Sequence, residues 1–193
     1  MEVLLGLLTV APMSGYDLGQ AIRTSVGYMW NESYGQIYPN LKKLEAAGFV
    51  ESKAERQKGK PERRIYSITK KGRKRLEAWL AMEPQPGIPR NELLLKLFFG
   101  AQTSPEIQIQ HIERMVERES ANLREFKRIE EEELPKNQQY PDAPYWKMAA
   151  RFGQLELKAH MRWAEETLEE LQKIAKSQRK TSEGGKGKNH AEK

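Results

Sequence analysis

The feature that most constrains this chain is a change of hydrophobic period after Gly48 and a second change at Thr69. Before Gly48, apolar residues recur every three or four positions, as amphipathic helices require. Between the two points lie two short runs of alternating apolar and polar residues, which is typical of strands. Helical spacing then returns. The first 80 residues therefore predict the order helix, helix, helix, two-stranded ribbon, helix.

Local start and stop signals set the expected bounds of these elements. Proline ends a helix, serine and threonine cap helix starts, and glycine ends a helix in the left-handed conformation. The signals expected to act in this way are Pro12, Ser14, Ser33, Gly48 and Thr69. The elements expected between them are helices over 1–12, 15–26, 33–48 and 70–82, and strands over 49–52 and 64–68.

A cluster of prolines and glycine over 84–90 predicts a linker. The residues after it carry only helix signals, with expected helices over 91–99, 104–134 and 143–176, the second opened by Ser104 at the N-cap and Pro105 at the first helical position. The glycine- and lysine-rich residues 177–193 are expected to be a disordered basic tail. The sequence thus predicts an N-terminal domain over 1–83 and a helical domain over 91–176.

Positive charge is concentrated in one short stretch of the chain. The formal net charge is +6, and residues 51–80 alone carry eleven Lys or Arg against four Asp or Glu. A local excess of this size indicates a surface that binds a polyanion, although a solvated basic face gives the same pattern.

Composition excludes several kinds of chemistry. The chain has no cysteine and three histidines, and it lacks phosphate-loop, dinucleotide and zinc-protease motifs, so we expect neither an enzyme nor a metal or cofactor site. The apolar run from Val3 to Met13 is too short to span a membrane and Glu2 does not suit a secretory signal, which predicts a cytoplasmic protein. With only 38% hydrophobic residues, the long helices are expected to share their core with a partner chain.

The predicted element order is that of a winged helix-turn-helix, in which the third helix enters the DNA major groove and the ribbon tip contacts flanking phosphates. Polar and basic residues on the outer side of the third helix are the candidate DNA contacts: Ser33, Gln36, Tyr38, Pro39, Asn40, Lys42 and Lys43. The candidate wing contacts are Lys58, Lys60, Arg63 and Arg64. Tyr16 and Tyr66 are expected in the core. A protein-interaction module with a basic ribbon is the alternative from another functional class.

Several motifs in order along residues 3–80 resemble the PadR family of bacterial transcriptional regulators. The motifs are Leu5-Gly6-Leu7-Leu8, Ser14-Gly15-Tyr16-Asp17-Leu18, Gln36-Ile37-Tyr38-Pro39, Gly48-Phe49-Val50 and Ile68-Thr69. The helical remainder resembles the larger-tailed branch, which includes phenolic-acid-responsive repressors. The resemblance implies a homodimer whose binding to an operator is relieved by a small ligand. The expected function is therefore a ligand-responsive repressor that binds a pseudo-palindromic operator as a homodimer, with a transcriptional activator as the alternative.

The C-terminal helices carry two further expectations. Residues spaced four and three apart form a stripe expected to pack between two copies of the chain: Leu157, Met161, Ala164, Leu168 and Leu171. Aromatic and polar residues near the domain junction and on the last helix are candidates for a pocket that takes a small aromatic effector: Trp30, Phe98, Tyr145, Trp146, Arg151 and His160. The expected fold class is mostly α, a winged helix-turn-helix domain followed by a helical dimerisation domain with long coiled-coil-like helices.

Overall fold

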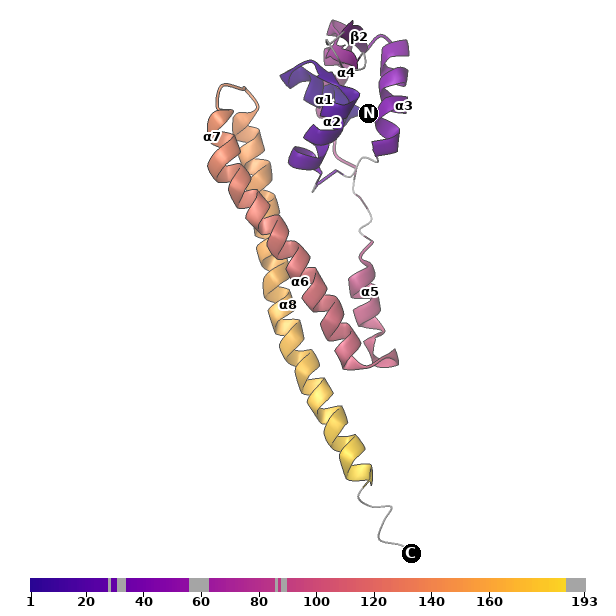
Figure 1. Cartoon of the computed structure of the whole chain (residues 1–193), viewed down its shortest axis with the longest axis vertical. Helices are drawn as coiled ribbons and strands as arrows, with labels where there is room; N and C mark the ends of the chain where they lie inside the picture. The colour runs from indigo at the N-terminus through magenta and orange to yellow at the C-terminus, as the bar shows by residue number, and fades with distance from the viewer. Residues whose placement is uncertain (28, 31–33, 56–62, 86, 88–89, 187–193) are drawn as a thin grey trace, which may run out of the picture. The chain divides into compact units, whose positions relative to one another are not determined.

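The computed structural model describes residues 1–27, 29–30, 34–55, 63–85, 87 and 90–186 (Figure 1). The chain divides into two compact units, Met1–Pro86 and Gly87–Lys193. The first combines helices with a small sheet and the second is helical. The predicted fold class, a winged helix followed by long helices, is confirmed.

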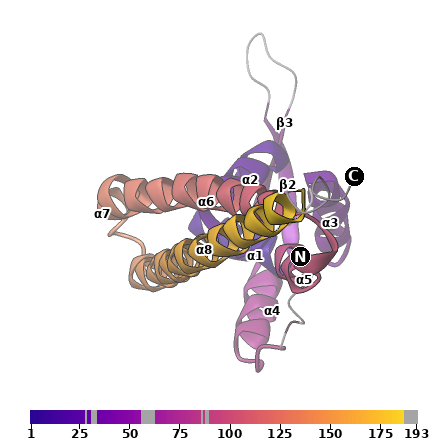
Figure 2. The same cartoon turned by 90° about the horizontal axis from the view of Figure 1, so that it is seen from below.

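The N-terminal unit has the predicted element order. Its elements are α1 (Glu2–Val10), β1 (Met13–Ser14), α2 (Gly15–Ala21), the π-helical turn η1 (Ile22–Val26), α3 (Tyr34–Ala46), β2 (Val50–Glu55), β3 (Arg63–Ile68) and α4 (Lys70–Leu80). The strands β2 and β3 pair antiparallel as the expected ribbon (Figure 2). The short strand β1, which the sequence did not predict, pairs with β3 and completes a sheet in the order β1-β3-β2.

Three local signals act as the sequence predicted. Ser14 caps α2 in a capping box, in which its Oγ accepts a hydrogen bond from the Asp17 backbone N–H at 3.2 Å. Thr69 caps α4, since its Oγ1 accepts from the Gly72 N–H at 3.0 Å. Gly48, at φ 72°, ends α3 in the left-handed region. Gly48 and Thr69 fix where the ribbon begins and ends.

One hydrophobic core holds the N-terminal unit together. It collects side chains from α1, α2, η1, α3, both strands of the ribbon and α4: Leu4, Leu5, Leu8, Leu18, Ile22, Ile37, Leu41, Leu44, Val50, Tyr66 and Leu76. The backbone of α4 packs directly on the start of β2, because a Cβ on Gly72 would lie 2.1 Å from the Phe49 carbonyl oxygen. The core thereby sets the position of α3 against the ribbon.

The C-terminal unit is built on a pair of long helices. Its elements are α5 (Glu92–Phe98), the 3-10 turn η2 (Gly100–Gln102), α6 (Pro105–Arg128), the π-helical turn η3 (Ile129–Glu133), α7 (Leu134–Lys136) and α8 (Ala143–Lys186). The helices α6 and α8 lie side by side as an antiparallel hairpin (Figure 1). Ile112 near the start of α6 packs with Leu171 late in α8, and Phe126 near the end of α6 packs with Ala150 early in α8.

The structure gives the stripe of α8 an intrachain partner. Leu157 packs with Phe126, and Ala164, Leu168 and Leu171 pack with Ile112 and its neighbours on α6. The heptad-like spacing had predicted that this stripe, including the half-buried Met161, packs against a second copy of the chain. The regular spacing does demand a helical partner, but α6 of the same chain supplies it.

The last helix also runs further than predicted. The apolar stripe ends at Ala175, where the sequence analysis placed the helix end, yet α8 continues to Lys186. Beyond the stripe, Arg179 forms an ion pair with Glu106 of α6 at 2.9 Å. Residues 177–186 are therefore helical and not part of a disordered tail. None of the described helices combines the length and apolar character that a membrane span requires.

Candidate nucleic-acid interface

The helix α3 separates an apolar face from a polar one. Ile37, Leu41 and Leu44 are at most 1% exposed and belong to the core. On the opposite side, Gln36, Pro39, Lys42 and Lys43 are exposed, so an amide, two ammonium groups and a proline ring share one surface. Such groups can hydrogen-bond base edges and phosphates.

Tyr38 lies at the edge of this surface. Its side chain is 52% exposed. A Cβ on Gly15 would lie 2.6 Å from Tyr38 Cε1, so the Tyr38 ring packs directly on the first residue of α2. Pro39 is the sixth residue of α3, so its missing N–H removes one intrahelical hydrogen bond.

Two predicted contacts on α3 do not join this surface. Asn40 is only 9% exposed, so its side chain is buried and is not part of the exposed side of α3. Ser33 lies outside the described residues. We therefore define the α3 surface as Gln36, Tyr38, Pro39, Lys42 and Lys43.

The two described wing arginines are paired with carboxylates. Arg63 Nε donates to Glu55 Oε2 at 2.6 Å, and this hydrogen bond raises the pKa of Arg63 above its usual value. Arg64 lies 3.5 Å from Glu45 of α3. A DNA phosphate would have to compete with these carboxylates for either arginine. The other predicted wing contacts, Lys58 and Lys60, lie outside the described residues.

Glu45 is a positioning residue that the sequence analysis missed. Its Oε1 accepts a hydrogen bond from Ser52 Oγ of β2 at 2.5 Å, and its Oε2 faces Arg64 of β3. One carboxylate thus ties the end of α3 to both strands of the ribbon. The pair Glu55 and Arg63 could have been found from sequence, because the two residues are directly opposite in the ribbon.

Part of the positive charge at α4 serves the fold. Lys71 Nζ donates to the Ala47 carbonyl at 2.8 Å. Arg75 pairs with Glu2 at 2.7 Å, and its guanidinium lies 5.2 Å from the centre of the Phe49 ring. The basic stretch 51–80 therefore divides into cations that hold elements together and exposed cations such as Lys74.

The two tyrosines expected in the core have different environments. Tyr66 is 7% exposed and belongs to the core, as predicted. Tyr16 is 56% exposed, so its assignment to the core was wrong. Tyr16 is the second residue of α2, and its hydroxyl accepts a hydrogen bond from Gln20 Nε2 at 2.8 Å.

The predicted effector residues are not gathered at one place in the C-terminal unit. Phe98, Tyr145, Arg151 and His160 are exposed, on α5 and along α8. Trp146 is half-buried and packs at 5.7 Å from the Tyr140 ring centre. Trp30 belongs to the N-terminal unit, where it is half-exposed.

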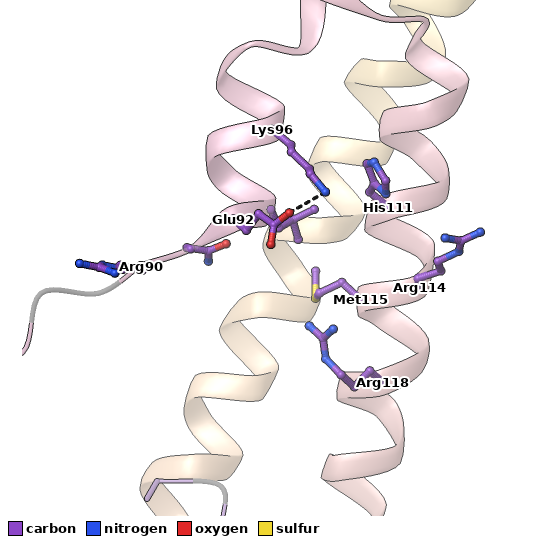
Figure 3. Close-up of a pocket in the computed structure, with 9 residues that line it drawn as sticks. Arg90, Glu92, Lys96, His111, Arg114, Met115 and Arg118 are labelled. Atoms are coloured by element: carbon purple, nitrogen blue, oxygen red, sulfur yellow. Dashed lines mark ion pairs between the residues drawn. The ribbon is translucent and has the colours of Figure 1, made fainter. Parts of the chain in front are cut away.

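A hollow of about 420 Å³ does lie between α5 and α6, but none of the six predicted effector residues lines it (Figure 3). Within the described parts of the chain, no group of three or more acidic or histidine side chains is arranged to hold a metal ion.

Two family models match the chain in turn. Residues 4–78 match the transcriptional regulator PadR-like family, and residues 89–172 match the family described as virulence activator alpha C-term. Residues 4–78 are thus a domain of the PadR-like family of transcriptional regulators. Members of this family are regulators and not enzymes, which agrees with the sequence prediction.

One individual relative is similar to about half of the chain. The chain is 36% identical over 97 residues to the negative transcriptional regulator PadR of Bacillus subtilis, a match that covers 50% of this chain and 53% of the relative. The chain thus spans about half the length of that relative.

Solved structures resemble both units of the PadR-like chain. A Streptococcus mutans protein matches with a TM-score of 0.77 and 28% identity, over 86% of this chain and 96% of that one. Bacillus subtilis PadR in complex with operator DNA matches with a TM-score of 0.74 and 27% identity, over 88% and 97% of the two chains.

Two further solved structures that resemble the chain are those of an activator and of a complex with a small molecule. The Vibrio cholerae virulence activator AphA matches with a TM-score of 0.70 and 26% identity, over 90% and 98% of the two chains. Bacillus subtilis PadR has also been solved with p-coumaric acid, and that structure matches with a TM-score of 0.67 and 25% identity, over 89% and 97%.

Proposed function

We propose that this PadR-like regulator is a homodimeric repressor that binds a pseudo-palindromic operator and is released from it by a small organic effector. The observation that carries the proposal is the α3 surface, whose amide and paired lysines are exposed on a helix held by a buried core. A two-fold dimer presents two such helices to one side of the duplex, so half-sites should lie about one helical turn, or a multiple of it, apart.

Relatives support the DNA and effector parts of the proposal. Bacillus subtilis PadR is named a negative regulator, and it has been solved with operator DNA and with p-coumaric acid. A chain that acts on bacterial DNA in this way would work in the cytoplasm.

Exposed apolar side chains on the C-terminal unit support the dimer. No residue of α5 is buried, although five of its seven residues are leucine or phenylalanine. Phe98 is 81% exposed, and Tyr145 and Phe152 on α8 are each 66% exposed. Large apolar patches on a soluble protein mark interaction sites. We assign this apolar surface of α5 and α8 to contact with a second copy.

The α3 lysines provide the main test of DNA binding. Changing both Lys42 and Lys43 to Ala should weaken binding to any duplex and reduce the slope of log affinity against log salt by up to about two, because two phosphate contacts are lost. Mobility shifts over a salt series measure this slope. The control variant with Lys147 and Lys158 of α8 changed to Ala removes the same charge and should leave the slope unchanged. An equal slope in the wild type and the α3 variant would contradict the assignment.

Gln36 tests base recognition separately from phosphate contact. Because an amide can pair with a base edge, Gln36→Ala should weaken operator binding by about 1–3 kcal/mol while binding to random duplex changes little. Competition between operator and random DNA measures the difference. Equal losses on both would remove Gln36 from base recognition.

Activation is the second candidate function. The match of residues 89–172 to the virulence activator C-terminal family and the likeness to AphA favour it. Deletion of the gene should raise transcription of the bound target if the protein represses and lower it if the protein activates. Fragments that the purified protein captures from its own genome identify the targets on which this is measured.

A further inference from the structure

The adjacent wing arginines Arg63 and Arg64 on β3 are held by carboxylates to different extents. Arg63 has two carboxylate partners, Glu55 at 2.6 Å and Asp17 at 3.8 Å. Arg64 lies 3.5 Å from Glu45, and no other carboxylate pairs with it among the described residues. The Arg64 side chain is 65% exposed, against 43% for Arg63. Arg64 is therefore the wing arginine that can change its partner more readily.

Glu45 lies where this ion pair borders the α3 surface. It follows Lys42 by three residues, so the two side chains are neighbours on one side of α3. Lys42 is exposed and Glu45 is half-buried. Glu45 thus places a negative charge beside a surface whose own charges, on Lys42 and Lys43, are positive. Because Arg64 pairs with Glu45, its guanidinium lies at the edge of the same surface.

We propose that Glu45 competes with DNA phosphate for Arg64 and thereby lowers the affinity of the protein for the backbone of any duplex. This inference rests on the proposed function. A phosphate beside Lys42 finds Arg64 already paired, and it gains that contact only by displacing the Glu45 carboxylate. An exposed ion pair contributes little stability, so the exchange is weakened and not prevented. Since phosphate contacts carry no base information, the effect is the same on operator and random DNA.

A second contact of Glu45 allows its charge to be removed without breaking its link to the ribbon. Ser52 Oγ donates a hydrogen bond to Glu45 Oε1 at 2.5 Å. The side-chain oxygen of glutamine can accept the same hydrogen bond, but an amide has no negative charge to hold Arg64. Glu45→Gln therefore keeps α3 tied to β2 and releases the arginine. If Glu45 only positioned α3, this variant would bind DNA as well as the wild type or more weakly, whereas competition requires a gain.

Binding of the full chain to a random-sequence duplex over a salt series tests the proposal. Glu45→Gln should bind about threefold more tightly or better at low salt, and its slope of log affinity against log salt should steepen by up to about one, because one phosphate contact is gained. The same gain is expected on operator fragments captured from the genome. A variant that fails to fold cannot imitate a gain of affinity.

Two further variants show whether the gain depends on Arg64. Glu51→Gln removes an exposed carboxylate of β2 that pairs with no described cation, so it should leave the slope unchanged. In a protein that already carries Arg64→Gln, adding Glu45→Gln should change the affinity by less than about 1.5-fold, because the arginine to be released is absent.

Three outcomes would overturn the proposal. They are no gain on random duplex in Glu45→Gln, an equal gain in Glu51→Gln, and a gain that persists in the Arg64→Gln background. If one of them occurs while the wild type still shifts operator fragments, the proposed function stands and only the competition by Glu45 is excluded. If the wild type binds no duplex at low salt, the proposed function is contradicted, and the role of Glu45 with it.

Discussion

The two units of the chain differ in how they use their apolar residues. In the N-terminal unit, every helix and both ribbon strands contribute to one core. In the C-terminal unit, the buried residues form two smaller clusters along the α6–α8 hairpin, and α5 adds only the half-buried Leu93 and Leu97 to one of them. Phe98 and Phe152 are among the large apolar residues left at its surface. A unit with one closed core can hold α3 in place by itself, whereas a hairpin with exposed apolar faces is suited to association.

The packing of the N-terminal unit is tightest at Gly72, which tolerates no added atom. A Cβ at Gly72 would lie 2.1 Å from the backbone oxygen of Phe49, which cannot move without separating α4 from the ribbon. We expect Gly72→Ala to destabilise this unit by about 3 kcal/mol or more and to abolish DNA binding. Chemical denaturation followed by circular dichroism measures the loss.

Gly6 provides the matched control for this variant. It lies inside α1, and nothing lies within 4 Å of an added Cβ. Gly6→Ala should stabilise the unit by about 0.5–1 kcal/mol, because alanine favours the helix. A Gly72→Ala protein as stable as wild type would show that α4 does not need its close contact with β2.

Two substitutions by aspartate test how the C-terminal unit uses its apolar side chains. Leu168 is half-buried against α6, so Leu168→Asp should destabilise the hairpin by about 2–3 kcal/mol. Phe98 is 81% exposed, so Phe98→Asp should leave the hairpin stable and disrupt only contacts with a second copy. Light scattering should report a dimer for wild type and a smaller mass for Phe98→Asp with unchanged helix content. A dimer that survives Phe98→Asp would exclude α5 from the interface.

Much of the fold could be predicted because its signals are local. Gly48, Thr69 and Ser14 act on residues within one turn of themselves, and each has its predicted role. The strand β1 was missed because two residues have no period, and its pairing partner Tyr66 is far away in the chain. The stripe of α8 packs on α6 of the same chain, which the sequence did not indicate, because a heptad pattern specifies a helical neighbour without saying which chain supplies it.

The candidate site likewise has features that could be predicted from sequence and features that could not. The exposed side of α3 follows from helical geometry, so Gln36, Lys42 and Lys43 were placed correctly on one surface. The Glu45 carboxylate that pairs with Arg64 depends on how α3 meets β3, which no short window of sequence contains. The α5–α6 hollow was missed for the same reason, since Lys96 and Arg118 come together only when the two helices pack.

The smallest expected effect concerns the ion pair that joins α1 to α4. Burial raises the pKa of Glu2, but a backbone hydrogen bond, Arg75 and the N-terminal ammonium outweigh it, so the pKa lies below its usual value near 4.5. A carboxyl with a lowered pKa in the folded state stabilises the fold above its unfolded pKa, and this contribution is lost as the pH falls through the folded value.

Glu2→Gln should therefore lower stability at neutral pH by about 0.2–1 kcal/mol and flatten the loss of stability below about pH 4.5. Urea midpoints of the full chain over an acid pH series measure both effects. Glu77→Gln, a change of an exposed carboxylate on α4, is the control and should keep the acid dependence of the wild type. Identical acid dependence in Glu2→Gln and wild type would mean that the closed core of the N-terminal unit holds α1 to α4 without help from this pair.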